Sequence, residues 1–283
     1  MRLITEVEEW RSFAESQRRA ARRVGLVPTM GALHAGHTSL FDAARENGDV
    51  VIATLFVNPR QFNDSSDLDR YPRTPEVDRA TAEAHGVDCL VEPSLAAMWP
   101  AYPDATPTTV SVRGLSDVLE GAARPGHLDG VASVVAKLLI VTGPCRVYFG
   151  EKDFQQLAVI RQMVSDLSFD AEVVGCAIVR DDDGLALSSR NVQLDADARR
   201  RALALSRAVA AVAEAPAPAS QHRRRLRETL GADLDVVYAE VVNPVTFAPS
   251  LDTDSGQARA LVAAHVDGVR LIDNGPVVLK GEQ

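Results

Sequence analysis

The stretch Val24-Gly-Leu-Val-Pro28-Thr-Met-Gly31-Ala-Leu-His34-Ala-Gly-His37 decides the fold of this chain. Its first four residues are largely apolar and predict a buried strand. We expect this strand to end at Pro28, because proline cannot donate to a sheet ladder, and the chain to turn at Gly31. A helical pattern begins at residue 38 or 39. A strand that turns directly into a helix starts a crossover unit, and the helix N-terminus there offers N–H groups and a positive dipole end to a phosphate.

The same alternation of short apolar runs and helical patterns continues through the first 160 residues. Further strands are predicted at 50–57, 89–91, 146–149 and 171–179, and helices at 39–47, 75–85, 131–140 and 157–167. Gly48 and Gly86 stand where helix C-terminal caps belong. Strands alternating with helices predict an α/β fold, a doubly wound parallel sheet.

The pattern changes after residue 177. It begins with a polar loop at 180–191, followed by one helix at 195–213 and another after the Pro-Ala break. Strand-like runs come last, at 234–242, 261–266 and 269–272. They predict a smaller C-terminal α+β domain, so the expected domains are 1–177 and 178–283.

Composition excludes several classes of protein. The net charge of −9 argues against broad nucleic-acid binding, and the basic run at 222–227 is interpreted as a solvated helix face. No apolar run approaches the roughly 20 residues of a membrane span, and the acidic N-terminus is unlike a secretory signal, so we expect a cytoplasmic protein without a membrane partner. Three widely spaced cysteines predict buried thiols.

The two imidazoles of the opening stretch suit a phosphate site. His34 and His37 can donate hydrogen bonds to a triphosphate and to charge that develops during transfer, and His37 can also donate a proton. A packing or capping role, or a metal pair, remains the alternative. Without cysteine or a Glu-x-x-His context nearby, the metal alternative is the weaker one.

Three further segments carry polar groups of the same kind. Lys152 in Phe149-Gly-Glu-Lys-Asp153 would bring a point charge to phosphates, Arg190 in Leu187-Ser-Ser-Arg190 could bind them bidentately, and Gln61 follows the second long strand as a neutral amide. Taken singly, these segments could be a surface charge cluster, a helix-capping turn and a strand-ending turn.

Together the four segments resemble the pantoate–β-alanine ligase family, the pantothenate synthetases of the His-x-Gly-His nucleotidyltransferase superfamily. The likeness extends through Tyr71-Pro-Arg-Thr74, Arg124-Pro-Gly-His-Leu-Asp-Gly130 and Leu185-Ala-Leu-Ser-Ser-Arg-Asn191. It implies a Rossmann-like domain with a C-terminal lid domain, a homodimer, and an AMP-forming ligase that joins a C–N amide bond. In that reaction, ATP and pantoate give pantoyl adenylate and pyrophosphate, and β-alanine then displaces AMP to form pantothenate, a precursor of coenzyme A.

The resemblance also implies the site residues. The catalytic set would be His37, His34, Lys152 and Arg190. The ATP-binding set would be Met30, Gly31, Ala32, Leu33, His34, Ala35, Gly36, His37, Gly150, Glu151, Lys152, Asp153, Val179, Leu187, Ser188, Ser189 and Arg190. Pantoate would be bound by Gln61, Gln156, Pro28, Met30 and Val131, and β-alanine by Gln61.

Magnesium is the one cofactor that the resemblance implies, with no organic prosthetic group. It would be held mainly by the ATP phosphates. Family members carry two adjacent acidic residues after the Tyr-Pro-Arg-Thr motif, whereas here Val77 separates Glu76 from Asp78, so Asp78 is at most a single protein contact to the metal.

Two other functions remain open at this stage. A nucleotidyltransferase of the same superfamily could transfer AMP to a phosphate, although the neutral Gln61 and Gln156 stand where such an acceptor would need basic residues. The chain could also be a noncatalytic nucleotide-binding module, since fold alone does not guarantee chemistry. The sequence offers no dedicated base for the β-alanine amine.

Overall fold

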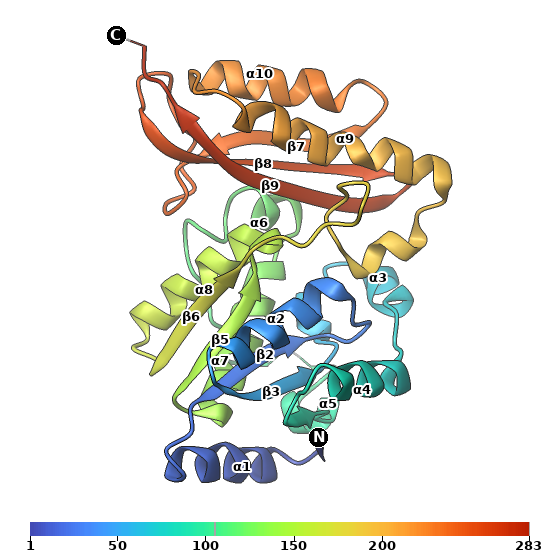
Figure 1. Cartoon of the computed structure of the whole chain (residues 1–283), viewed down its shortest axis with the longest axis vertical. Coiled ribbons are helices and arrows are strands. Elements are labelled where there is room, and N and C mark those ends of the chain that lie inside the picture. The colour runs from blue at the N-terminus through green and yellow to red at the C-terminus, as the bar shows by residue number, and fades with distance from the viewer. Residues whose placement is uncertain (105, 283) are drawn as a thin grey trace. The chain divides into compact units, whose positions relative to one another are not determined.

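The computed structural model describes residues 1–104 and 106–282, and the chain forms two compact units. The first comprises Met1–Glu151 and Gln156–Ala177, and the second comprises Lys152–Gln155 and Ile178–Gln283. Figure 1 draws the first unit mostly in blue to yellow-green and the second in yellow to red.

A six-stranded parallel sheet forms the centre of the first unit. Its order is β1-β4-β3-β2-β5-β6. The strands are β1 (Arg2–Ile4), β2 (Val24–Thr29), β3 (Val50–Leu55), β4 (Cys89–Val91), β5 (Cys145–Gly150) and β6 (Ala171–Cys176). The order reverses between β2 and β5, so the carboxyl ends of these neighbouring strands border the crevice where such sheets bind ligands. The doubly wound α/β prediction is confirmed.

Helices cover the sheet on both faces. Helix α2 (Ala35–Glu46) contacts β2, β3 and β5, while α1 (Val7–Arg19) and α7 (His127–Thr142) contact each other and β2. The remaining helical segments are η1 (Pro59–Gln61), α3 (Ser65–Arg70), α4 (Pro75–Ala84), α5 (Leu95–Met98), α6 (Glu120–Ala123), η2 (Glu151–Asp153) and α8 (Phe154–Asp166). Phe41 of α2 and Val27 of β2 are fully buried in the core between these layers.

Local signals predicted most of these elements, but several bounds differ: β2 continues through Pro28 to Thr29, β3 ends at Leu55, and α7 begins at His127. Gly48 and Gly86 adopt the left-handed conformation expected after α2 and α4, with φ of 73° and 71°. The N-terminal β1 and α1 were not predicted; β1 is only three residues long and is recognisable mainly by its pairing with β4. The strand expected at 171–179 ends at Cys176.

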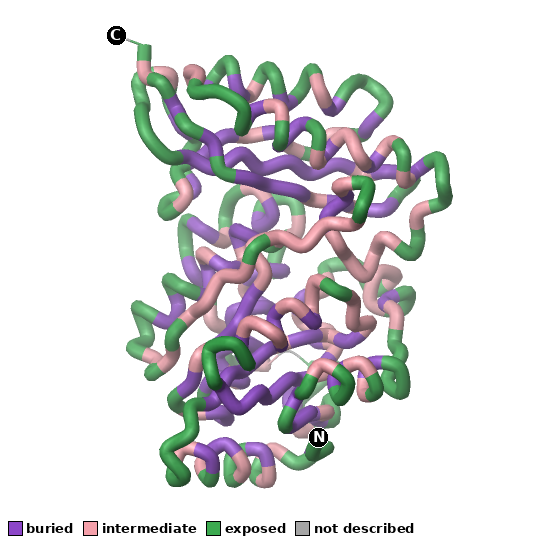
Figure 2. The backbone as a smooth tube through the Cα atoms, in the orientation of Figure 1, coloured by how far each residue is buried: buried purple, intermediate pink, exposed green. Residues whose placement is uncertain are grey.

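The second unit is an antiparallel sheet with two helices. Strands β7 (Asp235–Val242), β8 (Gly256–Val266) and β9 (Val269–Leu279) pair in that order, and α9 (Ala196–Ala213) and α10 (Ala219–Leu230) pack on them; the short η3 (Ser189–Gln193) precedes α9. Asp267 and Gly268, both at positive φ, make the two-residue turn between β8 and β9. The predicted smaller α+β domain is confirmed, and Figure 2 shows its strands as largely buried.

Two of the sequence features noted above, the lack of a long apolar run and the basic run, can be compared with residues 1–104 and 106–282. No helix there is long and apolar enough to cross a bilayer. The basic run on α10 exposes Arg224 and Arg227, whereas His222 at its start is buried and its Nε2 lies 3.1 Å from the carbonyl oxygen of Val278. Within that run Arg224, Arg225 and Arg227 are exposed, Arg223 is partly exposed, and His222 and Leu226 are buried, so only its arginines form a solvated face.

Candidate active site

The turn after β2 is held by the side chain of Asp78, which lies on α4 and is 2% exposed. Its Oδ2 accepts a hydrogen bond from the backbone N–H of Ala32 (3.0 Å) and its Oδ1 one from Leu33 (2.8 Å). Gly31 (φ 82°) and Ala32 (φ 50°) are both in the left-handed region. A methyl group on Gly31 would lie 2.9 Å from Asp78 Oδ2, so glycine is required for both conformation and space.

His34 and His37 form a reciprocal cap at the start of α2. The Nδ1 of His34 accepts from the backbone N–H of Gly36 (3.1 Å), and the Nδ1 of His37 accepts from that of His34 (3.4 Å). The ring centroids are 4.1 Å apart. Because each Nδ1 offers a lone pair to an N–H, the proton of the neutral ring is on Nε2, which makes Nε2 a hydrogen-bond donor.

Of the alternatives that the sequence left open for the two histidines, the capping role is present. Both imidazoles cap the helix through Nδ1, which is therefore an acceptor in each ring. Among the described residues, no group of three or more His, Cys, Asp and Glu side chains is placed to hold a metal ion. A helix N-terminus with two imidazole donors is suited to binding an anion.

Gln61 ends the short helix η1 and is 8% exposed. Its Nε2 lies 3.0 Å from Met30 Sδ, so the structure brings together two of the residues predicted to bind pantoate. Asn58, which caps η1, donates from Nδ2 to Gln61 Oε1 (3.0 Å) and to the carbonyl of Gly130 (3.1 Å). The indole Nε1 of Trp99 donates to Asn58 Oδ1 (2.9 Å).

Helix α7 supports the backbone of Gln61. The Nδ1 of His127 lies 2.8 Å from the carbonyl oxygen of Gln61, and Arg124 Nη2 donates to the same oxygen at 3.5 Å. Both residues belong to the Arg124–Gly130 segment, whose function the sequence alone did not suggest. Of the other predicted pantoate residues, Pro28 is partly exposed on β2, Val131 is 2% exposed on α7, and Gln156 is partly exposed on α8.

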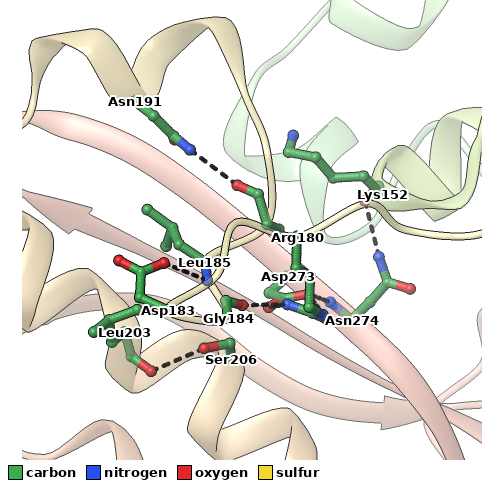
Figure 3. Close-up of polar contacts among 11 residues, drawn as sticks. Lys152, Arg180, Asp183, Gly184, Leu185, Asn191, Leu203, Ser206, Asp273 and Asn274 are labelled. Carbon is green, nitrogen blue, oxygen red and sulfur yellow. Dashed lines mark hydrogen bonds and ion pairs between the residues drawn. The ribbon is translucent and has the colours of Figure 1, made fainter. Parts of the chain in front are cut away.

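In the second unit, the segment that carries Lys152 is fixed by strand β9. Asn274 Nδ2 donates to the backbone carbonyl of Lys152 (2.8 Å), and Asn274 Oδ1 accepts from Arg259 Nε (2.7 Å). The Arg259 guanidinium lies 4.0 Å from the ring centroid of Phe154. Lys152 Nζ is 3.6 Å from Asp153 Oδ1. Figure 3 shows Asn274 pointing at the Lys152 backbone, with the Lys152 side chain directed away from it.

The neighbouring residue on β9 fixes the polar loop. Asp273 accepts two hydrogen bonds from Arg180, at 2.7 and 2.9 Å, and Arg180 also donates to the carbonyl of Gly184 (3.1 Å; Figure 3). The hydrogen bond to Asp273 raises the pKa of Arg180. The buried Leu185 inserts into the core of this unit. The adjacent Asp273 and Asn274 of β9 thus hold the start of the polar loop and the backbone of Lys152.

The end of the loop carries the remaining predicted ATP residues. Leu187 N–H donates to the carbonyl of Val179 (3.0 Å), and Ser188 Oγ accepts from the N–H of Arg190 (3.3 Å) at the start of η3. Ser189 is the first residue of that short helix, and Ser188 is its N-cap. The capping turn that the sequence allowed as an alternative is therefore present.

Comparisons with known proteins agree on one family. The family model described as pantoate-beta-alanine ligase matches residues 2–276. A pantothenate synthetase of Ruegeria pomeroyi is 45% identical over 277 residues, covering 96% of each chain, and one of Chelativorans sp. is 49% identical over 280 residues, covering 97% of each.

Solved structures give the same result. A pantothenate synthetase from Thermus thermophilus superposes with a TM-score of 0.87 at 44% identity, covering 97% of this chain and 99% of the other. A pantoate-beta-alanine ligase from Francisella tularensis, complexed with beta-gamma ATP and beta-alanine, has a TM-score of 0.79 at 32% identity and covers 97% of each chain.

Proposed function

This chain belongs to the pantoate–β-alanine ligase family, and from that premise we propose how its residues share the work of the reaction. It is a ligase that condenses pantoate with β-alanine to pantothenate at the expense of ATP, through pantoyl adenylate. In the first step a carboxylate oxygen of pantoate attacks the α-phosphorus and pyrophosphate leaves. In the second step the β-alanine amine attacks the acyl carbon and AMP leaves.

The first unit is proposed to bind the ATP phosphates through Met30, Gly31, Ala32, Leu33, His34, Ala35, Gly36 and His37. The observation that carries this assignment is the reciprocal cap, in which each Nδ1 accepts a backbone N–H and each Nε2 is a donor. Donors fixed by backbone bonds need little reorganisation when charge develops on the phosphates. His37 is the proposed proton donor.

A second set is proposed from the resemblance, with Gly150, Glu151, Lys152 and Asp153 following β5 and with Val179, Leu187, Ser188, Ser189 and Arg190 in the loop region. Lys152 and Arg190 would supply positive charge to the phosphates during adenylate formation. The fixed backbone of Lys152, held by Asn274, supports this role because an anchored main chain limits where the ammonium group can reach.

Pantoate is proposed to bind Gln61 and Gln156 through their amides, with Pro28, Met30 and Val131 as the apolar wall, and β-alanine to bind at Gln61. The contact between Gln61 and Met30 supports a site that combines one polar and one apolar group. Neutral amides also speak against an acceptor that is itself a phosphate, which would need basic residues there.

Magnesium is proposed to enter as the complex with ATP. The carboxylate of Asp78 already accepts from Ala32, Leu33 and Thr74, and the described residues contain no cluster of three or more His, Cys, Asp and Glu side chains placed to bind a metal. The residues therefore do not supply a protein cage for the ion. Binding mainly through phosphates is common for magnesium, which keeps several of its waters.

We further propose that the enzyme is a homodimer and works in the cytoplasm. The family resemblance supports the first statement. The free thiols of Cys89, Cys145 and Cys176 support the second, since unpaired cysteines are usual in a reducing compartment.

An ATP–pyrophosphate exchange assay, run with and without pantoate, tests the assignment. Exchange should require pantoate, and His37→Ala and Lys152→Ala should each lower it by roughly 10²-fold, the usual loss for one transition-state donor. His265→Ala is the matched control, because His265 pairs with the exposed Asp235 in the second sheet. Near-normal exchange in both folded site variants, or exchange without pantoate, would contradict the assignment.

A further inference from the structure

A short relay of buried polar groups connects Trp99 to Gln61. Trp99 Nε1 donates to Asn58 Oδ1 (2.9 Å), and Asn58 Nδ2 donates to Gln61 Oε1 (3.0 Å) and to the Gly130 carbonyl (3.1 Å). Asn58 is 1% exposed and Trp99 5% exposed, so neither relies on water for these bonds. From this relay we propose that Trp99 is a positioning residue for the acid substrate, acting through Asn58 on the amide of Gln61.

Only one assignment of donors and acceptors satisfies all the hydrogen bonds of the relay. An indole N–H can only donate and a peptide carbonyl can only accept, so Asn58 satisfies both Trp99 and Gly130 in a single amide orientation. In that orientation the second N–H of Asn58 points to Gln61, whose Oε1 must accept. Gln61 Nε2 is then the end of the amide that lies beside Met30, at 3.0 Å from Sδ.

The consequence for binding is chemical. With its oxygen occupied by Asn58, Gln61 offers a ligand N–H donors. A donor end matches a carboxylate oxygen of a small hydroxy acid, whereas a flipped amide would turn its oxygen toward that carboxylate and repel it. This inference deepens the proposed function and rests on it, since it assumes that Gln61 binds pantoate.

Trp99 is itself held in place by charged side chains. Its ring centroid lies 4.5 Å from the Arg60 guanidinium and 5.2 Å from Lys137 Nζ. Lys137 also donates to the backbone carbonyls of Ala97 and Met98, immediately before Trp99. Cations over an aromatic face stabilise the ring position, so removing only the N–H should leave the packing largely intact.

The substitution Trp99→Phe makes this change, because phenylalanine keeps an aromatic ring and lacks the N–H. Trp10→Phe is the matched control. Trp10 is fully buried in the same unit, and its Nε1 has no hydrogen-bond partner among the described residues. Both variants remove one buried indole, but only one removes a bond of the relay.

Pantoate KM, measured by ATP–pyrophosphate exchange, should rise about tenfold in Trp99→Phe, equivalent to about 1.4 kcal/mol, while ATP KM and the Trp10→Phe values stay near wild type. In a Gln61→Ala background, Trp99→Phe should raise pantoate KM little further, because the Gln61 amide that the relay orients is already absent. Unchanged pantoate KM in folded Trp99→Phe, or an equal loss in the Gln61→Ala background, would overturn the proposal.

Two further outcomes separate this inference from the proposed function. If Gln61→Ala leaves pantoate KM unchanged, both the pantoate role of Gln61 and the relay are wrong. If Gln61→Ala raises it and Trp99→Phe does not, only the relay is wrong.

A second measurement covers the case in which Trp99→Phe does not fold. The sequence contains two tryptophans, so Trp10→Phe leaves Trp99 as the single indole N–H signal in a nitrogen-15 NMR spectrum. Saturating pantoate should shift that signal and slow its hydrogen exchange. An unmoved signal with unchanged exchange at saturation would refute the relay.

Discussion

Replacing Gly130 with alanine should damage pantoate use far more than it damages the fold. Gly130 lies inside α7 against the turn that carries Gln61. A methyl group on its Cα would stand 2.2 Å from the carbonyl oxygen of Arg60, 2.6 Å from its carbon and 2.8 Å from the Cα of Gln61. All three atoms are backbone, so no flexible side chain can move aside.

The geometry sets the size of the effect. To restore ordinary contact, η1 must withdraw from α7 by about 1.2 Å. Overpacking of this kind lowers the free energy of unfolding by about 1–3 kcal/mol. Alanine is a better helix former than glycine in a helix interior and offsets about 1 kcal/mol of that loss. With these typical values the net loss of stability is about 0–2 kcal/mol, whereas a displacement of about 1 Å at a substrate-binding group can lower activity by about 10²-fold.

Urea denaturation and pantoate-dependent pyrophosphate exchange separate the two effects. Gly130→Ala should lower kcat/KM for pantoate by about 10²-fold in a protein that is still folded. Ala136→Gly on the same helix is the control, since it weakens the helix by about 1 kcal/mol and inserts no atom. A folded Gly130→Ala variant with kcat/KM for pantoate within twofold of wild type would show that the close approach of α7 to η1 does not position Gln61.

Two other results are expected. Asn274→Ala removes the amide that holds the Lys152 carbonyl and Arg259, so unfolding should become easier by about 1–3 kcal/mol and ATP KM should rise; an unchanged ATP KM would argue against an anchoring role. Burial raises the pKa of Cys89 and Cys145 to about 12. Because these folded pKa values exceed the unfolded value of about 8.5, the unfolded chain loses these protons first and stability should fall as pH rises above about 8.5. At pH 8 a thiol reagent should modify the less buried Cys176 first, and rapid modification of all three thiols in the native protein would contradict this expectation.

Much of the fold followed from local pattern. Most strands of the central sheet are short apolar runs, and glycines mark the turn after β2 at Gly31 and the end of α2 at Gly48. The hairpin between β8 and β9 was predictable in the same way from Asp267-Gly268. The short β1 was not, because its three residues have too little pattern to distinguish a strand from a loop, and only pairing with β4 defines it.

The candidate site was predictable only in part. Residues that follow a strand or begin a helix, such as His34, His37 and Lys152, could be found because their position along the chain implies their place in the fold. From the sequence, Asp78 was considered only as a single contact to magnesium, whereas its hydrogen bonds to Ala32 and Leu33 give it a positioning role in the turn. The roles of Trp99 and Asn274 could not be predicted from the sequence, since each residue contacts a segment that is distant along the chain.

By itself the sequence determined the α/β architecture, the strand-to-helix turn with its two histidines, and the family, because hydrophobic periodicity, proline and glycine act over a few residues. Only the tertiary structure decided which atoms of those residues face a ligand. The orientation of the Asn58 amide depends on partners 41 and 72 residues away, and the Lys152 backbone is held by a residue 122 positions later. Which atom of a side-chain amide donates and which accepts depends on its neighbours in space, so a periodic sequence pattern cannot predict it.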